Sequence, residues 1–302
     1  MEPAIAVEHL RKTYGEVVAV DDVAFGVDRG EIFGIIGPNG SGKTTTVEIL
    51  QGLRRPDAGA ISVLGLDPQT QGEDLRRHVG SQLQESALPD RIKVWEALDL
   101  FGAAAGDRRR DWREAARQWG IYDRRNAAFA NLSGGQRQRL FIALALITEP
   151  TLVFLDEMTT DLDPAARRVA WELIRSVREQ GATIVLVTHF MDEAEQLCDR
   201  IAVFQSGRIT ASDSPSGLIR RHGGSRTVRF STSESDLDWL AGVTDVQSIE
   251  RNGHQVVVRG DAAVLAHVGA ALVARGMAPP DLRVDLPTLE DVYMRLVRSE
   301  AG

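Results

Sequence analysis

EIFGIIGPNGSGKTTTVEILQG (31–52) decides the fold of this 302-residue chain. It opens with a short, nearly continuous apolar run, which is typical of a strand buried on both faces of a sheet. The run leads into GPNGSGKT, a match to G-x-x-x-x-G-K-[ST], and residues 44–52 then read as a helix. A strand, a glycine-rich loop and a helix in this order predict an α/β fold with a phosphate-binding loop.

The residue types in this loop suit a phosphate chain with a bound metal ion. Glycines let backbone N–H groups curl around phosphate oxygens, and the helix that follows points its positive end at the same anion. Lys43 can reach the β- and γ-phosphates, and Thr44 can ligate Mg²⁺. The predicted nucleotide-binding residues of the loop are Gly37, Pro38, Asn39, Gly40, Ser41, Gly42, Lys43, Thr44 and Thr45.

Two further apolar runs, TLVFLD (151–156) and TIVLVTH (183–189), predict central strands of the same, mostly parallel sheet. Ligands of such sheets bind beyond the carboxyl ends of the strands, where polar residues follow both runs. Asp156 suits the outer coordination sphere of Mg²⁺. Glu157 suits polarising a water that attacks the γ-phosphate. Residues 164–180 follow as an amphipathic helix.

Composition narrows the class of protein. The net charge of −8 argues against a nucleic-acid partner. Cys198 is the chain's one cysteine, so we expect a reducing compartment and no internal disulfide. The N-terminus lacks the pattern of a signal peptide, and no run of about 18 apolar residues is present. We therefore expect that the chain does not cross a membrane by itself.

The remaining sequence divides into a helical region and a second domain. Residues 90–148 have a helical pattern rich in Ala and Arg, and the composition changes near residue 213, where a short helix opens at Pro215. RHGGSR (221–226) is typical of a linker. The order βαββαβ then predicts a small split-βαβ domain with a last helix from Thr288. Its expected elements are strand 227–231, helix 236–241, strand 246–250, an Asn-Gly turn at 252–253 into QVVVR, helix 262–275 and strand 282–286.

LSGGQ (132–136) is a second glycine-rich loop that contains no acid, base or metal ligand. With the phosphate loop before it and LVFLDE (152–157) after it, residues 1–220 resemble an ATP-binding subunit of an ABC transporter. The whole chain resembles the daunorubicin-type (ABC-2) ATPases of bacterial drug-resistance exporters, which carry a small C-terminal domain.

The resemblance implies a P-loop NTPase fold with a central, mostly parallel sheet and an N-terminal antiparallel β portion. It further implies a helical subdomain at about 90–148 and, at 221–302, a small α+β (ferredoxin-like) accessory domain. ATP and Mg²⁺ are the implied ligands.

The resemblance also assigns residues outside the phosphate loop. Tyr14 matches the aromatic residue on which adenine stacks, and His189 matches the histidine that contacts the γ-phosphate. Gln84 matches the glutamine that couples Mg²⁺ and water to the membrane partner, while Gln82 is a competing candidate two residues earlier. The implied catalytic set is Glu157, His189 and Gln84, and the implied metal ligands are Thr44, Gln84 and Asp156.

In the family that the chain resembles, LSGGQ opens a helix and closes over ATP held by a second copy. The residues implied to bind nucleotide in this way are Ser133, Gly134, Gly135, Gln136 and Asp163. The implied partners are a second ATPase subunit, most simply a copy of the same chain, and integral membrane permease subunits. The chain would then act in ATP-driven drug or lipid-like export at the cytoplasmic face of the cell membrane.

Two alternatives use the same motifs. The first is a soluble ATPase of this superfamily that acts on ribosomes or DNA, although such members usually carry two cassettes or coiled-coil insertions. The second is a small-molecule kinase, in which LSGGQ would have no purpose.

The chain also departs from the family's PTTGLDP with MTTDLDP, which has Met158 for proline and Asp161 for glycine. Because Asp161 adds negative charge near phosphate, we expect slower or more tightly coupled turnover.

Overall fold

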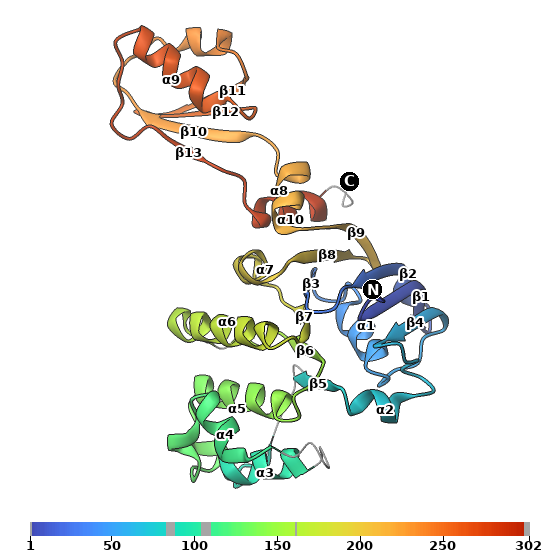
Figure 1. Cartoon of the computed structure of the whole chain (residues 1–302). Helices are drawn as coiled ribbons and strands as arrows, with labels where there is room; N and C mark the ends of the chain where they lie inside the picture. Colours follow the sequence, from blue (N-terminus) through green and yellow to red (C-terminus); the bar gives the residue numbers. More distant parts are fainter. Residues whose placement is uncertain (1, 83–87, 104–109, 161, 299–302) are drawn as a thin grey trace. The chain divides into compact units, whose positions relative to one another are not determined.

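A computed structural model describes residues 2–82, 88–103, 110–160 and 162–298. The chain forms two compact units, residues 1–215 and residues 216–302. Each unit is described by itself (Figure 1).

The first unit is built around a six-stranded sheet of order β5-β6-β7-β3-β8-β9, in which only β9 runs antiparallel to its neighbour. The three predicted strands lie side by side in its middle, and every residue of them is buried, which explains their apolar composition. The strands are β3 (Ile32–Ile36), β5 (Val79–Gln82), β6 (Leu152–Asp156), β7 (Thr183–Val187), β8 (Arg200–Gln205) and β9 (Arg208–Asp213).

A second, antiparallel sheet has the order β2-β1-β4. Two of its strands precede the phosphate loop in the chain, and the third follows it. Its strands are β1 (Ile5–Tyr14), β2 (Val17–Val27) and β4 (Ala58–Val63). One hydrophobic core joins this sheet, the six-stranded sheet and helix α1 (Lys43–Leu50), with Ile5, Phe33 and Val47 among its members. The expected P-loop NTPase fold and its antiparallel β portion are therefore confirmed.

The described part of the region predicted to be helical, residues 90–103 and 110–148, holds three α-helices. They are grouped in Figure 1 at the β5 edge of the sheet. They are α3 (Val94–Ala103), α4 (Trp112–Gln118) and α5 (Gly134–Leu146), with 3₁₀ helices η2 (Tyr122–Arg124) and η3 (Phe129–Asn131) between them. The stacked rings of Trp112 and Tyr122 pack α4 against η2, and Trp95 of α3 lies 6.0 Å from the Trp112 ring. A shorter helix, α2 (Gly72–Arg76), precedes β5.

Helices α6 (Pro164–Glu179) and α7 (Met191–Leu197) are the elements that follow the central strands β6 and β7 in the chain. Cys198 follows α7 directly and packs against Gly34 of β3. A Cβ atom on Gly34 would lie only 2.7 Å from the Cys198 sulfur, so this contact requires glycine. The amphipathic helix predicted at 164–180 is confirmed.

The second unit is a four-stranded antiparallel sheet of order β11-β12-β10-β13 with its own hydrophobic core. Its elements are α8 (Pro215–His222), β10 (Arg226–Ser231), η4 (Asp238–Gly242), β11 (Val246–Asn252), β12 (Gln255–Gly260), α9 (Val264–Ala274), β13 (Arg283–Asp285) and α10 (Leu289–Arg298).

Three details of this unit bear on the sequence predictions. The capping box at the start of α10 is confirmed, because the backbone N–H groups of Thr288 and Asp291 each donate to the other's side chain. The α-helix predicted at 236–241 is wrong. The Asp236 carboxylate accepts from the Asp238 N–H and Gly242 closes the segment, so the five residues left form only a 3₁₀ helix. The region 221–226 predicted as a linker is shortened to residues 223–225, since α8 ends at His222 and β10 begins at Arg226.

Within the described ranges, no helix combines the length and the apolar composition needed to cross a bilayer.

Candidate functional site

The phosphate loop joins β3 to α1 in a backbone conformation that two glycines permit. Gly42 caps α1 with φ of 99°, and a Cβ atom there would lie 2.3 Å from the Ala19 carbonyl oxygen. A Cβ atom on Gly37 would lie 2.3 Å from the Phe204 carbonyl oxygen. The loop is therefore held tightly by its neighbours, with the N-terminus of α1 free to direct N–H groups at an anion.

Lys43 is buried in this loop. Its ammonium group donates to the carbonyl oxygens of Gly37 and Pro38, each at 2.9 Å. Burial lowers the pKa of Lys43, and the charges of Glu157 and Asp156 oppose that shift. The lysine thus lies in the field of both acids that follow one another at the end of β6, beside the loop whose phosphates it would contact.

The loop also has chemical features that fit a bound triphosphate with Mg²⁺. The buried Ser41 hydroxyl has no hydrogen-bond partner among the described residues. Thr44 and Asp156 offer the hard oxygen donors that Mg²⁺ prefers. In the described parts of the chain, no three His, Cys, Asp or Glu side chains group as a metal site. Proteins usually bind Mg²⁺ at such a site through one or two side-chain oxygens together with the phosphate oxygens of a nucleotide.

Asp156 ends β6 and is 4% exposed. Burial raises the pKa of this carboxyl to about 6; the neighbouring Glu157 charge adds to the rise and Lys43 opposes it. An acid whose charge is costly in this pocket would be stabilised as a carboxylate by a divalent cation. The raised pKa supports the prediction that Asp156 is the acid that lies near Mg²⁺.

Glu157 and His189 meet at the ends of two adjacent parallel strands. Glu157 Oε1 lies 3.3 Å from His189 Nδ1, and the Glu157 N–H donates to the Val187 carbonyl oxygen of β7 at 2.9 Å. Glu157 has φ of 48°, a strained value for a residue with a side chain, and such strain concentrates at functional sites. The structure therefore brings the predicted base and the predicted γ-phosphate contact together.

Tyr14 lies at the end of β1 with 39% of its surface exposed. The Arg54 guanidinium lies 5.2 Å and the Lys12 ammonium 5.6 Å from the centre of its ring. Both cations are fixed by acids, because Arg54 pairs with Glu48 of α1 at 2.6 Å and Lys12 pairs with Asp57 at 2.8 Å. The ring is accessible and held beside α1, as an adenine platform requires.

Gln84 and Asp161 lie outside the described residues. The competing Gln82 is 6% exposed at the end of β5, and its Oε1 accepts from Gln138 Nε2 of α5 at 3.2 Å. Met158, which stands where the family has proline, is buried.

The second glycine-rich loop forms the start of α5, as the sequence predicts. Ser133 is the N-cap, and its hydroxyl accepts from the Gln136 N–H at 3.4 Å. The Gln136 side chain accepts in return from the Ser133 N–H at 3.1 Å. This capping box fixes the loop, while Gly134 and Gly135 carry no side chain that could cover the helix end.

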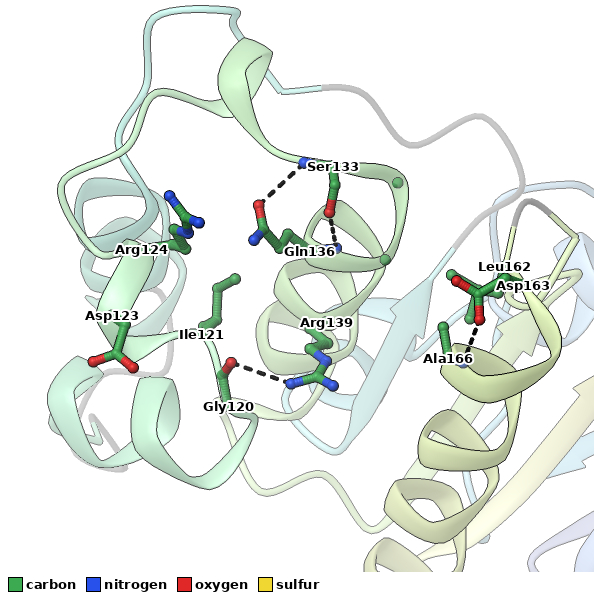
Figure 2. A pocket seen from close by; sticks show the side chains of 12 residues that line it. Gly120, Ile121, Asp123, Arg124, Ser133, Gln136, Arg139, Leu162, Asp163 and Ala166 are labelled. Carbon is green, nitrogen blue, oxygen red and sulfur yellow. Dashed lines mark hydrogen bonds between the residues drawn. The ribbon is translucent and has the colours of Figure 1, made fainter.

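Asp163 caps α6 in a similar way, because its Oδ1 accepts from the N–H groups of Ala165 at 2.9 Å and Ala166 at 2.8 Å. Asp163 and the LSGGQ loop share one pocket of about 690 Å³. Figure 2 shows Ser133 and Gln136 on the α5 side of this pocket and Asp163 at the start of α6. No residue of the phosphate loop lines the pocket, so the two glycine-rich loops serve separate sites within the described chain.

Several polar residues near these sites were not selected from sequence. Arg124 and Arg139 line the LSGGQ pocket, and Arg139 donates to the Gly120 carbonyl oxygen at 3.3 Å. Glu193 lies fully buried on α7, just after His189. Its position four residues before the buried Leu197 is a readable signal, since it puts an acid on the apolar face of a helix. Nothing in the sequence indicates that Arg54 contacts Tyr14.

Comparison with known proteins identifies the family. The ABC transporter family model matches residues 20–160. The Nod factor export ATP-binding protein I of Ralstonia nicotianae is 42% identical over 311 residues, which cover 99% of this chain and 95% of that protein. The daunorubicin resistance ATP-binding protein DrrA3 of Streptomyces coeruleorubidus is 35% identical over 303 residues, covering 98% and 96%.

A solved ATP-binding subunit of an ABC transporter is similar in structure, with a TM-score of 0.66 and 31% identity over 73% of this chain and 93% of that one. A dimeric ATP-binding cassette in a post-hydrolysis state with ADP and Pi gives a TM-score of 0.64 and 27% identity over 70% and 98%. Fold, motifs and relatives agree. The chain belongs to the ABC transporter family and is one of its ATP-binding subunits, the proteins whose hydrolysis of ATP drives transport.

Proposed function

We propose that the chain is the motor subunit of a bacterial ABC exporter that moves a drug or a lipid-like molecule. The observation that carries the proposal is the 3.3 Å contact between Glu157 and His189 beside the buried Lys43. Relatives that match nearly the whole chain are named for Nod factor export and daunorubicin resistance. These names support export and favour it over an ATPase that acts on ribosomes or DNA.

In the proposed reaction, backbone N–H groups at the start of α1 hold the phosphates and Lys43 holds the β- and γ-phosphates. Glu157 accepts a proton from the water that attacks the γ-phosphate. His189 contacts the γ-phosphate and holds it in place for that attack. Tyr14 stacks on adenine. Thr44, Asp156 and Gln84 would hold Mg²⁺, which supplies charge neutralisation of the phosphates when bound.

We further propose that two copies of the chain form the working dimer. The LSGGQ pocket is separate from the phosphate loop, so each copy would present Ser133, Gly134, Gly135, Gln136 and Asp163 to ATP held by the other. Arg124 and Arg139 line that pocket together with Asp123 and Asp163, so it offers groups of both charges to a ligand. Hydrolysis would remove the γ-phosphate that bridges the copies and allow them to separate.

Membrane permease subunits complete the proposed exporter, with the chain bound at the cytoplasmic face of the membrane. We assign residues 1–220 as the ATPase domain and residues 221–302 as the accessory domain. The strand order β11-β12-β10-β13 supports a ferredoxin-like accessory domain, because a βαββαβ chain of that type pairs its first strand with its third and fourth.

Glu157→Gln tests the proposal directly. Because the amide cannot accept the proton from water, we expect the rate of ATP hydrolysis to fall at least about 100-fold. Bound ATP would then persist, so gel filtration with light scattering should show a dimer with ATP and a monomer without it. Glu172→Gln, at an exposed position on α6, is the matched control and should behave as wild type. Only monomer for Glu157→Gln at saturating ATP would contradict the proposed dimer.

A further inference from the structure

Helix α6 holds the segment after His189 with a row of side chains spaced about one helical turn apart. The spacing of three and four residues puts them on one face of the helix. The four contacts are Arg167 Nη1 to Asp192 Oδ2 at 3.6 Å, Trp171 Nε1 to Glu193 Oε1 at 3.0 Å, Arg175 Nη2 to the Gln196 carbonyl oxygen at 3.0 Å, and Arg178 Nη2 to Asp199 Oδ1 at 2.9 Å.

Glu193 is the buried member of this row. It is 0% exposed, whereas Asp192 is exposed. Burial raises the pKa of Glu193, and the hydroxyls of Thr188 and Thr159, the Trp171 indole and the Arg167 charge oppose the rise. An acid in the interior costs stability unless polar groups surround it, so a packing role alone would be filled better by an apolar residue.

Two threonines whose hydroxyls oppose the rise in the Glu193 pKa lie beside the two proposed reactive side chains in the sequence. Glu193 Oε2 and the Thr159 hydroxyl are buried without a hydrogen-bond partner among the described residues, so the hydrogen bond that fixes the Glu193 side chain is the one from Trp171. Thr188 comes directly before His189, and Thr159 comes two residues after Glu157. Both threonines are 0% exposed. The Thr188 hydroxyl also accepts from the Phe190 N–H at 3.0 Å, so the same side chain turns the backbone at His189.

Ring contacts continue this connection to α6. The centres of the Phe190 and His189 rings lie 4.1 Å apart, and the Arg167 guanidinium lies 4.0 Å from the centre of the Phe190 ring. Arg167 is one turn after Asp163, where α6 begins. The helix capped by the proposed dimer-interface residue is thus bonded to the segment that carries His189.

We propose that Glu193 is a positioning residue for ATP hydrolysis. It accepts the Trp171 indole N–H and so fixes the His189 backbone to helix α6, and thereby to the position of Asp163. This inference rests on the proposed function, in which His189 holds the γ-phosphate. A shift of about 1 Å in a side chain that contacts the reacting phosphate can lower the rate about 100-fold. A hydrogen bond that fixes the backbone of His189 therefore has a measurable effect on the rate.

Variants of the full-length chain separate the hydrogen bond from the negative charge. Glu193→Gln retains an oxygen that can accept from Trp171, and we expect its kcat to stay within about threefold of wild type. Glu193→Ala and Trp171→Phe each remove the bond, and we expect kcat to fall about tenfold with KM for ATP within twofold, because the phosphate loop is untouched. The double variant should be no slower than either single one, since both remove the same contact.

Trp239→Phe is the matched control, because it removes an indole N–H from the second unit. Equal kcat for Trp171→Phe and Trp239→Phe would overturn the proposal. So would a rise in KM at constant kcat, or a Glu193→Gln variant as slow as Glu193→Ala. Glu157→Gln, assayed in the same experiment, distinguishes failure of the Glu193 inference from failure of the proposed function. If wild type hydrolyses no more ATP than Glu157→Gln, the proposed function fails.

Hydrogen exchange of the same proteins tests the positioning role without activity. Trp171→Phe should raise the exchange of backbone amides in the peptide 188–198, with the phosphate loop and β6 unchanged. Glu193→Gln should leave that peptide protected. Unchanged exchange of 188–198 in Trp171→Phe, or a general loss of protection across the first unit, would overturn the proposal even in a protein that hydrolyses no ATP.

Discussion

At the residue scale, the phosphate loop depends on two glycines for different reasons. Gly42 has φ of 99°, and a side chain there would collide with the Ala19 carbonyl oxygen at 2.3 Å. Gly40 has φ of 78°, but no atom lies within 4 Å of the place where its Cβ would be. An alanine at Gly40 would therefore meet only backbone strain, while one at Gly42 would meet strain and a steric clash.

We predict that Gly40→Ala lowers the free energy of unfolding by about 1 kcal/mol. Gly42→Ala should lower it by at least about 2 kcal/mol more and should abolish binding of a fluorescent ATP analogue. Urea denaturation and fluorescence titration measure the two effects. Equal stabilities for the two variants would show that the loop relaxes around the added methyl group.

A second residue-scale prediction concerns Glu193 and pH. Burial raises its folded-state pKa above the ordinary value of 4.5, so its contribution to stability is present below that value and is lost as pH rises through the raised pKa. Glu193→Gln does not titrate and keeps the bond to Trp171. We expect it to melt at a higher temperature than wild type at pH 7, with the difference shrinking as the pH falls through the raised pKa toward 4.5. Thermal melts across this range measure the effect, and an advantage that grows at low pH would contradict it.

The sequence could indicate which candidate site residues lie near one another, because their motifs need a fixed order along one strand or loop. Lys43, Asp156 and Glu157 each follow a buried strand, so the sheet brings them together. Glu193 was not predicted, because its partners come from α6 and from the ends of two strands. Contacts between segments that are distant in the chain leave little trace in a single sequence. Gln84 stays a prediction.

At the element scale, α6 and α5 both begin with a side chain that caps the helix and faces the LSGGQ pocket. Asp163 satisfies the N–H groups of Ala165 and Ala166, which would otherwise lack partners at the start of α6. The cap therefore has a structural role separate from any contact with a second copy.

We predict that Asp163→Ala lowers the free energy of unfolding by about 1 kcal/mol, because it removes the cap. Asp163→Asn keeps an oxygen acceptor and should lose only a few tenths of that amount. Urea denaturation in the absence of ATP measures the cap alone. If the alanine variant were as stable as the asparagine variant, the cap would contribute nothing.

Elements with a strong pattern were predictable, and so were the short strands β10, β11 and β13, which match the predicted 227–231, 246–250 and 282–286. The runs at 31–37, 151–156 and 183–189 match β3, β6 and β7, because strands buried on both faces must be apolar throughout. The segment 236–241, predicted as a helix, instead holds a 3₁₀ helix at Asp238–Gly242, preceded by a local hydrogen bond from the Asp238 N–H to the Asp236 carboxylate.

At the scale of the whole molecule, each unit has a hydrophobic core among the described residues, and the two share no residue. The first joins both sheets of residues 1–215 around α1, and the second lies within residues 216–302. A unit with its own core can fold and unfold apart from its neighbour. All phosphate-loop, LSGGQ and strand-end residues named above belong to the first unit.

We predict that a chain ending at Ser214, before α8, folds and binds ATP with the affinity of the full-length protein. If the second unit is an interaction module, the shortened chain should support less ATP-dependent dimerisation or less transport with its permease. Fluorescence titration, gel filtration and transport in membrane vesicles measure these three properties. Unchanged dimerisation together with unchanged transport would refute an interaction role for the second unit.

The packing of Cys198 against Gly34 has a practical consequence. The thiol is buried, and burial raises its pKa well above the ordinary value, so an alkylating reagent cannot reach a reactive thiolate while α7 stays on β3. Because the chain has one cysteine, every alkylation event marks the opening of that one region. The rate at which Cys198 is alkylated in the native protein therefore measures how often the packing of α7 on β3 opens.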